Sequence, residues 1–487
     1  MTWKPNEDDL EILRGQNPWH AEGAVPVTLA PAGRRSMAAH LWHALMASEN
    51  GRFQVVLGPR RVGKTTVLYQ TVAELLRRGV PASRIHWLRL DHPRLLEVPL
   101  GDLVRFLADQ LGATASNPAY VMLDELTYAE RFDLWLKTFH DERWPVRIAA
   151  TSSSSAALRE ARVESGVGRW EEQYLPPWTF DEYRRWNGDA PAFELHDSLD
   201  ASLRANLGVA MADQRLERRR YLLLGGFPEL LLKDDRGDEV SAVLDSQRIL
   251  RNDAVQNAIF RDLPQAYGVH EPFKLERLLY LLAGQVGGIV SPAKLATELQ
   301  LSTPTVERYV GYLERAFTLF LVPNFATAEE SVQRRGRRAY FCDGAVRNAA
   351  LHRGLLPLRD PNEMAKLVEN SVAAHLHALM QLGEGRLHYW RDGKHEVDFV
   401  FQERAEPIAF EVTLSASHAR AGLEALMQRH PRLRGRCWIV SPELPAMAPS
   451  AMTDGIGTLP LDLFLRVTGA QIDAVLRQRI GDRSALR

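Results

Sequence analysis

A glycine-rich turn between an apolar segment and a helical one places the strongest constraint on the fold. Phe53–Leu57 is apolar enough for a buried strand, and residues 65–77 have apolar side chains at helical spacing. Between them, Gly58-Pro59-Arg60-Arg61-Val62-Gly63-Lys64-Thr65, followed by Thr66, satisfies the P-loop pattern GxxxxGK[ST]. Backbone N–H groups of such a turn bind phosphate, Lys64 reaches the β- and γ-phosphates, and the Thr65 hydroxyl binds Mg²⁺. The sequence therefore predicts a site for ATP and Mg²⁺.

Two adjacent carboxylates follow another short apolar segment. Tyr120–Leu123 is typical of a buried strand, and Asp124 and Glu125 come directly after it. We expect Asp124 to hold Mg²⁺ through water and Glu125 to orient or deprotonate the attacking water, as in-line hydrolysis requires. The alternative is a pair of acids merely solvated at a strand end. Behind a P-loop, we interpret the pair as the Walker B element of an ATPase.

A third strand end carries hydroxyl groups. The apolar segment at 146–150 precedes Thr151 and Ser152. In a parallel sheet these side chains reach the same edge as the P-loop, where they can sense the γ-phosphate. The alternative is an N-cap for the following helix. Both roles are compatible with the sequence.

The length and the order of segments predict several domains. A chain of 487 residues exceeds the size of one growing core. Short apolar strands alternate with helical segments up to about residue 150, which predicts an α/β, three-layer P-loop NTPase domain with a parallel sheet. We expect this domain and its N-terminal lead-in over 1–235, a helical linker and winged helix over 236–345, and a small α/β domain over 346–487.

The chain resembles a family of prokaryotic AAA-type P-loop ATPases with a C-terminal domain of unknown function. The resemblance covers nearly the whole chain, and the motifs that carry it are Asn17-Pro18-Trp19, the P-loop with its double arginine, Leu123-Asp124-Glu125, Thr151-Ser152-Ser153-Ser154, Gly168-Arg169, Leu175-Pro176-Pro177-Trp178-Thr179-Phe180, Gly225-Gly226-Phe227-Pro228-Glu229, Arg261-Asp262, Tyr340-Phe341-Cys342-Asp343, Glu369-Asn370, Tyr389-Trp390-Arg391 and Glu396-Val397-Asp398-Phe399.

The resemblance implies an ATPase core, a winged helix and a module similar to the PD-(D/E)xK nuclease, or restriction-endonuclease-like, fold. AAA-type ATPases commonly form homo-oligomeric rings in which an arginine of one subunit completes its neighbour's site. Arg169 and Arg261 are the candidates for that arginine. The alternative for each is an ordinary surface or salt-bridge arginine.

The winged-helix candidate offers side chains for DNA. Residues 292–299 and 303–315 have helical patterns, with Ser302 as the N-cap of the second. Thr303, Thr305 and Arg308 at the start of that second helix suit phosphate and base contacts. The alternative is a protein-interaction lid, because winged helices serve that role as well.

A compact cationic turn follows, and it is the sharpest nucleic-acid signal in the chain. Arg334, Arg335, Arg337 and Arg338 surround Gly336 where the wing of a winged helix is expected. Such a turn suits phosphate binding. The alternative is a solvated surface turn.

The C-terminal module departs from an active nuclease. The family fold implies that Glu369, Asp398 and Glu411 would hold Mg²⁺, with a lysine two residues after Glu411 to position the nucleophile. Thr413 stands at the lysine position, and Lys394, before Glu396, is the alternative lysine that could reach in from a neighbouring strand. We therefore expect a degenerate nuclease fold kept for DNA binding or assembly.

Composition limits the remaining choices. The 60 Lys and Arg residues balance 61 Asp and Glu, so net charge indicates no polyanionic partner. Two cysteines and the lack of a long apolar run suit a cytoplasmic protein without membrane segments. We expect an ATPase that remodels or translocates along DNA. The alternatives are a nucleotide-controlled signalling or defence switch, and an ATP-dependent nuclease.

Overall fold

The structure is a computed structural model of the whole chain. It describes every residue except 1–2, 48–50, 154–167, 210, 212, 234–237, 327–335, 404–405, 415–419, 445–451 and 486–487, and the side chains of 480–487 are not described either. The chain divides into two compact units, Met1–Leu175 with Val475–Arg487, and Pro176–Ala474. The boundaries expected near residues 235 and 345 both fall inside the second unit.

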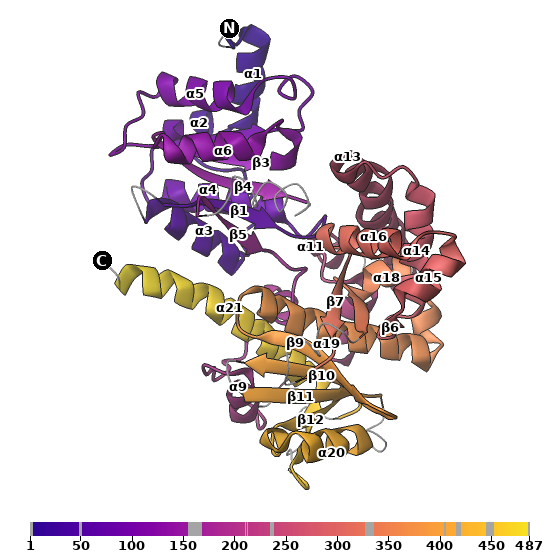
Figure 1. Cartoon of the computed structure of the whole chain (residues 1–487). Coiled ribbons are helices and arrows are strands. Elements are labelled where there is room, and N and C mark those ends of the chain that lie inside the picture. Colours follow the sequence, from indigo (N-terminus) through magenta and orange to yellow (C-terminus); the bar gives the residue numbers. More distant parts are fainter. Residues whose placement is uncertain are drawn as a thin grey trace. The chain divides into compact units, whose positions relative to one another are not determined.

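A five-stranded parallel sheet forms the centre of the first unit (Figure 1). Its strand order is β2-β3-β4-β1-β5, with bounds β1 Phe53–Leu57, β2 Ile85–Arg89, β3 Ala119–Asp124, β4 Val146–Ser152 and β5 Trp170–Tyr174. Four of these strands confirm the predicted α/β sheet. The fifth, β5, has a polar sequence, WEEQY, without the apolar run that marks a buried strand. Because all the strands are parallel, their carboxyl ends meet at one edge.

Helices cover both faces of this sheet. One pair, α3 (Ser36–Met46) and α4 (Lys64–Arg77), packs together against β1 and β4. A second pair, α5 (Leu100–Gln110) and α6 (Phe132–Asp141), packs together near β3 on the opposite side (Figure 1). These layers position the turn between β1 and α4 at the carboxyl edge.

The N-terminal lead-in closes the edge of the sheet at β2. After α1 (Glu7–Gln16), the Asn17 side chain accepts a hydrogen bond from the Trp87 N–H at 2.6 Å and donates one to the Trp87 carbonyl at 3.1 Å. Trp19 begins α2 (Trp19–Glu22) and donates its indole N–H to the Ile85 carbonyl at 2.9 Å. Asn17 and Trp19 therefore satisfy backbone groups that an open edge strand would leave unpaired.

The second unit begins with short helices. They are α8 Phe180–Trp186, α9 Leu199–Ala205, α10 Arg215–Leu224, α11 Pro228–Leu231, α12 Glu239–Leu250 and α13 Leu263–Tyr267, with π-helical turns over Arg251–Gln256 and Ala258–Asp262. Three amphipathic helices follow, α14 (Pro272–Gly284), α15 (Pro292–Leu299) and α16 (Thr303–Arg315). Two of them, α15 and α16, confirm the helical segments predicted over 292–299 and 303–315.

Two further sheets belong to the second unit. The first has the order β6-β8-β7 and is antiparallel, with β6 Ile289–Val290, β7 Leu319–Pro323 and β8 Arg337–Phe341. The second has the order β13-β12-β11-β10-β9, with β9 Arg386–Asp392, β10 His395–Glu403, β11 Glu406–Val412, β12 Cys437–Ser441 and β13 Ile456–Pro460. Its β9–β10–β11 part is antiparallel, and β11, β12 and β13 are parallel.

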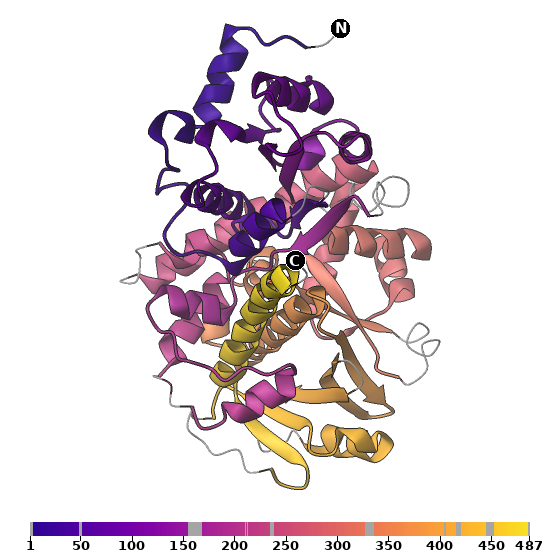
Figure 2. The same cartoon turned by 90° about the vertical axis from the view of Figure 1, so that its left-hand side faces the viewer.

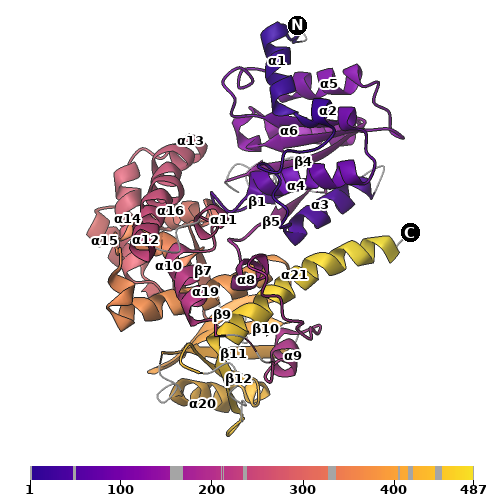
Figure 3. The same cartoon turned by 180° about the vertical axis from the view of Figure 1, so that it is seen from behind.

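Helix α19 (Pro361–Gln381) connects these two sheets, because it packs against β8 as well as β9 and β11 (Figure 3). The remaining helices are α18 (Gly344–Ala350), α20 (Arg420–Arg429) and the long α21 (Leu461–Ala485), which is yellow in Figure 2. None of the helices in the described part of the chain is long and apolar enough to cross a membrane.

Several motifs that carry the family resemblance hold segments of the second unit together through hydrogen bonds and close packing. The buried Asp343 carboxylate accepts hydrogen bonds from the N–H groups of Gly226 and Ala345, both at 2.8 Å. A Cβ at Gly226 would lie 2.3 Å from the Trp178 carbonyl oxygen. The Asn370 side chain pairs with both backbone groups of Phe341 at 2.9 Å. These contacts explain the motif residues through packing and hydrogen bonding.

Candidate nucleotide site

The backbone of the P-loop needs glycine at two positions. Gly63, the N-cap of α4, has a left-handed φ of 90°, a conformation that costs glycine little. Gly58 approaches another segment so closely that a Cβ there would lie 2.2 Å from the Leu175 carbonyl oxygen. Arg61 also has a positive φ, 64°. The turn is therefore held open by backbone geometry that other residues adopt only with strain.

Lys64 lies folded over the loop. Its side chain is buried, and Nζ donates hydrogen bonds to the carbonyl oxygens of Gly58 at 2.9 Å and Pro59 at 2.8 Å. Carbonyl groups are weaker partners for an ammonium group than phosphate oxygens. The ammonium group can therefore exchange these partners for phosphate without leaving the turn.

Thr65 and Asp124 meet across the carboxyl edge of the sheet. The Thr65 hydroxyl oxygen lies 3.1 Å from Oδ1 of Asp124 and 3.2 Å from Oδ2, and the Thr151 hydroxyl donates to Oδ1 at 2.6 Å. Burial raises the pKa of Asp124 to about 6, and the hydrogen bond from Thr151 acts in the opposite direction. A hydroxyl and a carboxylate at this spacing are the hard oxygen donors that Mg²⁺ prefers, so the residues present fit that ion.

Glu125 has a constrained position beside Asp124. Its φ of 58° is left-handed, and its N–H donates to the Thr151 hydroxyl at 3.0 Å. The Ser153 hydroxyl donates to the Glu125 carboxylate at 3.0 Å. The Thr151 hydroxyl therefore binds both acidic residues, Asp124 through its carboxylate and Glu125 through its backbone N–H. The sequence did not single out Ser153 as a site residue, and the only signal for it was its place in the serine run after β4.

The strand order explains why these residues come together. Strand β4 lies between β1, which leads into the P-loop, and β3, which ends at Asp124. Residue pairs across β1 and β4 include Val56 with Thr151 and Leu57 with Ser152. The end of β4, with Thr151 and Ser152, consequently lies between the strand that leads into the loop and the strand that ends at Asp124. The Ser152 residue itself is fully buried.

The two candidates for an arginine that acts on a neighbouring subunit differ. Arg169 binds Asp141 through two hydrogen bonds, at 2.8 and 2.9 Å, within the first unit. These bonds lower the pKa of Asp141 to about 2. Arg261 lies exposed in the π-helical turn Ala258–Asp262 of the second unit. Arg169 is thus held by its own subunit, which favours its structural alternative.

The residues expected to bind DNA have unequal exposure. Arg308 and Arg337 are exposed, Thr303 and Thr305 are half-buried, and the Ser302 side chain caps α16 as predicted. Arg334 and Arg335 lie outside the described residues. Arg338 is buried and forms ion pairs with Glu396 and Asp398. The prediction that Arg338 contacts phosphate is therefore wrong, because its guanidinium group is buried against carboxylates inside the protein.

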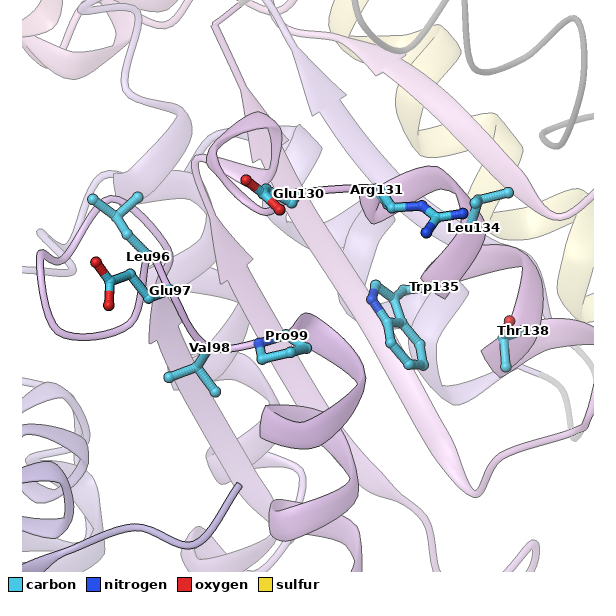
Figure 4. Close-up of a pocket in the computed structure, with 9 residues that line it drawn as sticks. All are labelled: Leu96, Glu97, Val98, Pro99, Glu130, Arg131, Leu134, Trp135 and Thr138. Atoms are coloured by element: carbon cyan, nitrogen blue, oxygen red, sulfur yellow. The ribbon is translucent and has the colours of Figure 1, made fainter. Parts of the chain in front are cut away.

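A separate hollow opens on the first unit, and it contains neither P-loop nor Walker B residues. Its volume is about 640 Å³, and its walls are the segment before α5 and the start of α6 (Figure 4), that is Leu96, Glu97, Val98, Pro99, Glu130, Arg131, Leu134, Trp135 and Thr138. Trp135 packs on Gly101, where a Cβ would lie 2.2 Å from the ring. No described contact links this hollow to the phosphate-binding turn.

The parallel sheet, the P-loop and the acids at the end of β3 define the class of P-loop NTPases. Three family models match the chain, "AAA domain" over residues 50–184, "Domain of unknown function (DUF8612)" over 215–356 and "Domain of unknown function (DUF4143)" over 364–447. The chain therefore has an AAA-type P-loop ATPase domain, followed by regions similar to two domains of unknown function.

Relatives extend over both units. An uncharacterized protein of Methanocaldococcus jannaschii is 25% identical over 390 residues, which cover 78% of this chain and 79% of that protein. An uncharacterized protein of Mycobacterium tuberculosis is 28% identical over 410 residues, covering 81% and 77%. The solved structure of a Walker-type ATPase of Pyrococcus abyssi has a TM-score of 0.42 at 15% identity, covering 66% of this chain and 98% of that one.

Proposed function

We propose that this protein is a Mg²⁺-dependent ATPase. The observation that carries the proposal is the 3.1 Å approach of the Thr65 hydroxyl to Asp124, directly beside Lys64 and Glu125. Hydrolysis of a phosphoanhydride needs a cation near the transferred phosphoryl group, a metal-binding oxygen pair and a group that orients water. Lys64, the Thr65–Asp124 pair and Glu125 match these three requirements.

Each residue has a defined part in the proposed reaction. Lys64 leaves the carbonyl oxygens of Gly58 and Pro59 and binds β- and γ-phosphate oxygens. Thr65 and Asp124 hold Mg²⁺, which when bound neutralises charge on those oxygens. Glu125 accepts a hydrogen bond from the attacking water through carboxylate lone pairs that the Ser153 hydroxyl does not occupy. Thr151 keeps both acids in register through its hydroxyl group.

The test compares ATP turnover and ATP binding in the full chain and its variants. Lys64→Ala should abolish turnover, because it removes the ammonium group that would bind the β- and γ-phosphate oxygens. Lys137→Ala, on α6, is the matched lysine control and should hydrolyse ATP at the rate of the native chain. Turnover by Lys64→Ala at the native rate would contradict the proposal.

We extend the proposal to DNA as the polymer on which the ATPase acts. Helices α14, α15 and α16 followed by the antiparallel β7–β8 hairpin support a winged helix-turn-helix. Arg308 is exposed on the first half of α16, and it forms no ion pair with another described residue. Arg337, at the start of β8, is exposed, and Arg334 and Arg335 precede it closely in the sequence.

DNA-stimulated hydrolysis is the signature of this extension. Arg308→Ala, and the pair Arg334→Ala/Arg335→Ala, should weaken the stimulation at moderate salt, and each phosphate contact removed should lower the log–log salt slope by about 1. Arg429→Ala removes an exposed arginine from α20 and serves as the charge-matched control. A DNA-dependent motor would be excluded if neither linear nor branched DNA changed the rate of ATP turnover at any salt concentration from low to moderate. Slow turnover with one nucleotide retained per subunit would instead support a nucleotide-controlled switch.

A further inference from the structure

The three carboxylates expected at a nuclease-like metal site do come together in the second unit. Glu369 comes from α19, Asp398 from β10 and Glu411 from β11. The Asp398 N–H donates to Oε2 of Glu411 at 3.3 Å, and the Val412 N–H donates to Oδ2 of Asp398 at 3.0 Å. The Tyr340 hydroxyl, from β8, donates to Oε1 of Glu369 at 2.7 Å.

A guanidinium group from another sheet is the cation of this cluster. Arg338 of β8 approaches Glu396 at 2.9 Å and Asp398 at 3.3 Å, and its guanidinium carbon lies 4.7 Å from the centre of the Tyr389 ring. Only 5% of the Arg338 side chain is exposed. A planar guanidinium group suits such a site, because it binds several carboxylate oxygens and an aromatic face at once.

The charge of Arg338 reaches all three carboxylates. Burial raises the pKa of Glu369 to about 8 and that of Glu411 to about 10, and it raises the pKa of Asp398 as well. In each case the positive charge of Arg338 acts in the opposite direction. Among the described residues, the ion pairs of Arg338 are those with Glu396 and Asp398, and its charge also acts on Glu369 and Glu411.

Little room remains beside these groups. A Cβ at Gly287, whose φ is 75°, would lie 2.5 Å from Oε1 of Glu369, so the backbone before β6 closes over that carboxylate. The Gly287 N–H is fixed by the Ala339 carbonyl at 3.1 Å. Within the described residues, no group of three Asp, Glu, His or Cys side chains is arranged to hold a metal ion. The side chains present therefore do not fit the divalent cation that an active nuclease fold implies.

We propose that Arg338 takes the place of the metal ion in the Glu369–Asp398–Glu411 cluster and turns it into an internal ion-pair joint between β8 and the β10–β11 hairpin. The β6-β8-β7 sheet and the β9–β13 sheet are joined through this arginine. The C-terminal module consequently performs no metal-dependent cleavage of nucleic acid, and its acids serve cohesion within the second unit.

An ion-pair joint has a distinctive response to mutation. Removal of one partner leaves a buried charge without compensation, whereas removal of both charges is tolerated far better. At a metal site, loss of the arginine would leave all the metal ligands in place, so it would not offset the effect of losing Asp398. A double-mutant cycle therefore separates the two cases.

The first experiment measures thermal unfolding of the full chain without nucleotide. Arg338→Met and Asp398→Asn should each lower the midpoint of the affected transition by several degrees, and the double variant should recover most of that loss. Arg429→Met, an exposed arginine on α20, is the matched control and should leave the midpoint unchanged. Losses that simply add in the double variant would overturn the proposal.

The second experiment covers the case in which Arg338→Met does not fold. Mn²⁺ binding is measured by electron paramagnetic resonance on the nucleotide-free chain carrying Asp124→Asn, which removes the ATPase metal ligand, with and without Asp398→Asn. We expect equal, weak binding in both, and no cleavage of supercoiled plasmid with Mn²⁺ or Mg²⁺. One tightly bound Mn²⁺ that Asp398→Asn abolishes, or cleavage that Asp398→Asn abolishes, would overturn the proposal.

Discussion

Gly58 and Leu175 are in backbone contact, and no side chain fits between them. The Leu175 N–H donates to the Leu57 carbonyl at 2.7 Å, and a Cβ at position 58 would lie 2.2 Å from the Leu175 carbonyl oxygen. Leu57 ends β1 and Leu175 directly follows β5, so the first residue of the P-loop rests on the segment that leaves the sheet. The glycine at position 58 thus serves packing as well as phosphate binding.

Gly58→Ala should therefore weaken both the fold of the first unit and ATP binding. The Cβ would force the P-loop away from Leu175, which we expect to cost about 1–3 kcal/mol of unfolding free energy. ATP affinity, measured by titration with a fluorescent analogue, should fall at least tenfold. Gly15→Ala is the control, because a Cβ at Gly15 of α1 meets nothing within 4 Å. Native affinity in Gly58→Ala would show that the turn adapts to the added group.

Glu125→Gln should separate ATP binding from hydrolysis. The amide keeps the shape of the side chain and its contact with Ser153, but it cannot accept a proton from water. We expect kcat to fall by about 10²-fold or more, with ATP affinity within threefold of the native value. Single-turnover kinetics with labelled ATP give both quantities. If Glu125→Gln kept the native kcat, a residue other than Glu125 would have to orient the attacking water.

The sequence could indicate the P-loop and the acids near it because these signals are local. The P-loop directly follows the apolar strand β1, the two acids lie at the end of β3, and the hydroxyl groups of Thr151 and Ser152 lie at the end of β4. Strand β5 escaped prediction because tertiary pairing with β1, and not its own polar sequence, makes it a strand. Ser153 escaped because a hydroxyl in a serine run has no distinguishing pattern until the position of Glu125 is known.

Arg338 shows a second limit of sequence reasoning. An arginine pair beside a glycine predicts an exposed cationic turn, and Arg337 does lie exposed. Strand alternation then places Arg338 on the other face of β8, toward acids about 60 residues further along the chain. That contact depends on how α19 and the two sheets pack, which no local pattern encodes. The convergence of Glu369, Asp398 and Glu411 was predicted, but the identity of their cation was not.

The stability of the first unit should depend on pH through Glu74. This carboxylate, 7% exposed, forms ion pairs with Arg34 at 2.5 Å, Arg77 at 2.5 Å and Arg78 at 3.0 Å. Hydrogen bonding from Arg77 lowers the pKa of Glu74 from 4.5 to about 2, against burial, which raises it. Because the folded pKa is the lower one, the stabilisation is complete above pH 4.5 and is lost as pH falls toward 2.

Glu74→Gln should consequently destabilise the first unit by about 1–2 kcal/mol at pH 7, a value reduced for the half-exposed arginines. The difference between variant and native chain should shrink as pH falls from 4.5 to 2. Thermal unfolding at several pH values measures it, with Glu22→Gln on α2 as a control for an exposed acid. A difference that stays constant with pH would assign the effect to packing.

In a ring, hydrolysis at one subunit's site would depend on an arginine from the neighbouring subunit. If the protein forms a ring, the exposed Arg261 is a candidate for the arginine that reaches a neighbouring site, and Arg169 binds Asp141 through two hydrogen bonds. Arg261→Ala should then lower kcat by about 10³-fold without changing the thermal unfolding of either unit. Arg169→Ala should act like Asp141→Asn, through stability.

Mixing inactive variants provides the control for this prediction. Subunits with Lys64→Ala keep Arg261, and subunits with Arg261→Ala keep an intact P-loop, so mixed oligomers should regain part of the turnover that each variant lacks. Mixtures of Lys64→Ala with Glu125→Gln should stay inactive. Each variant damages the nucleotide site of its own subunit, so no subunit in the mixture has both an intact P-loop and the water-orienting acid. Absence of recovery in the first mixture, with assembly shown by light scattering, would place the catalytic arginine elsewhere.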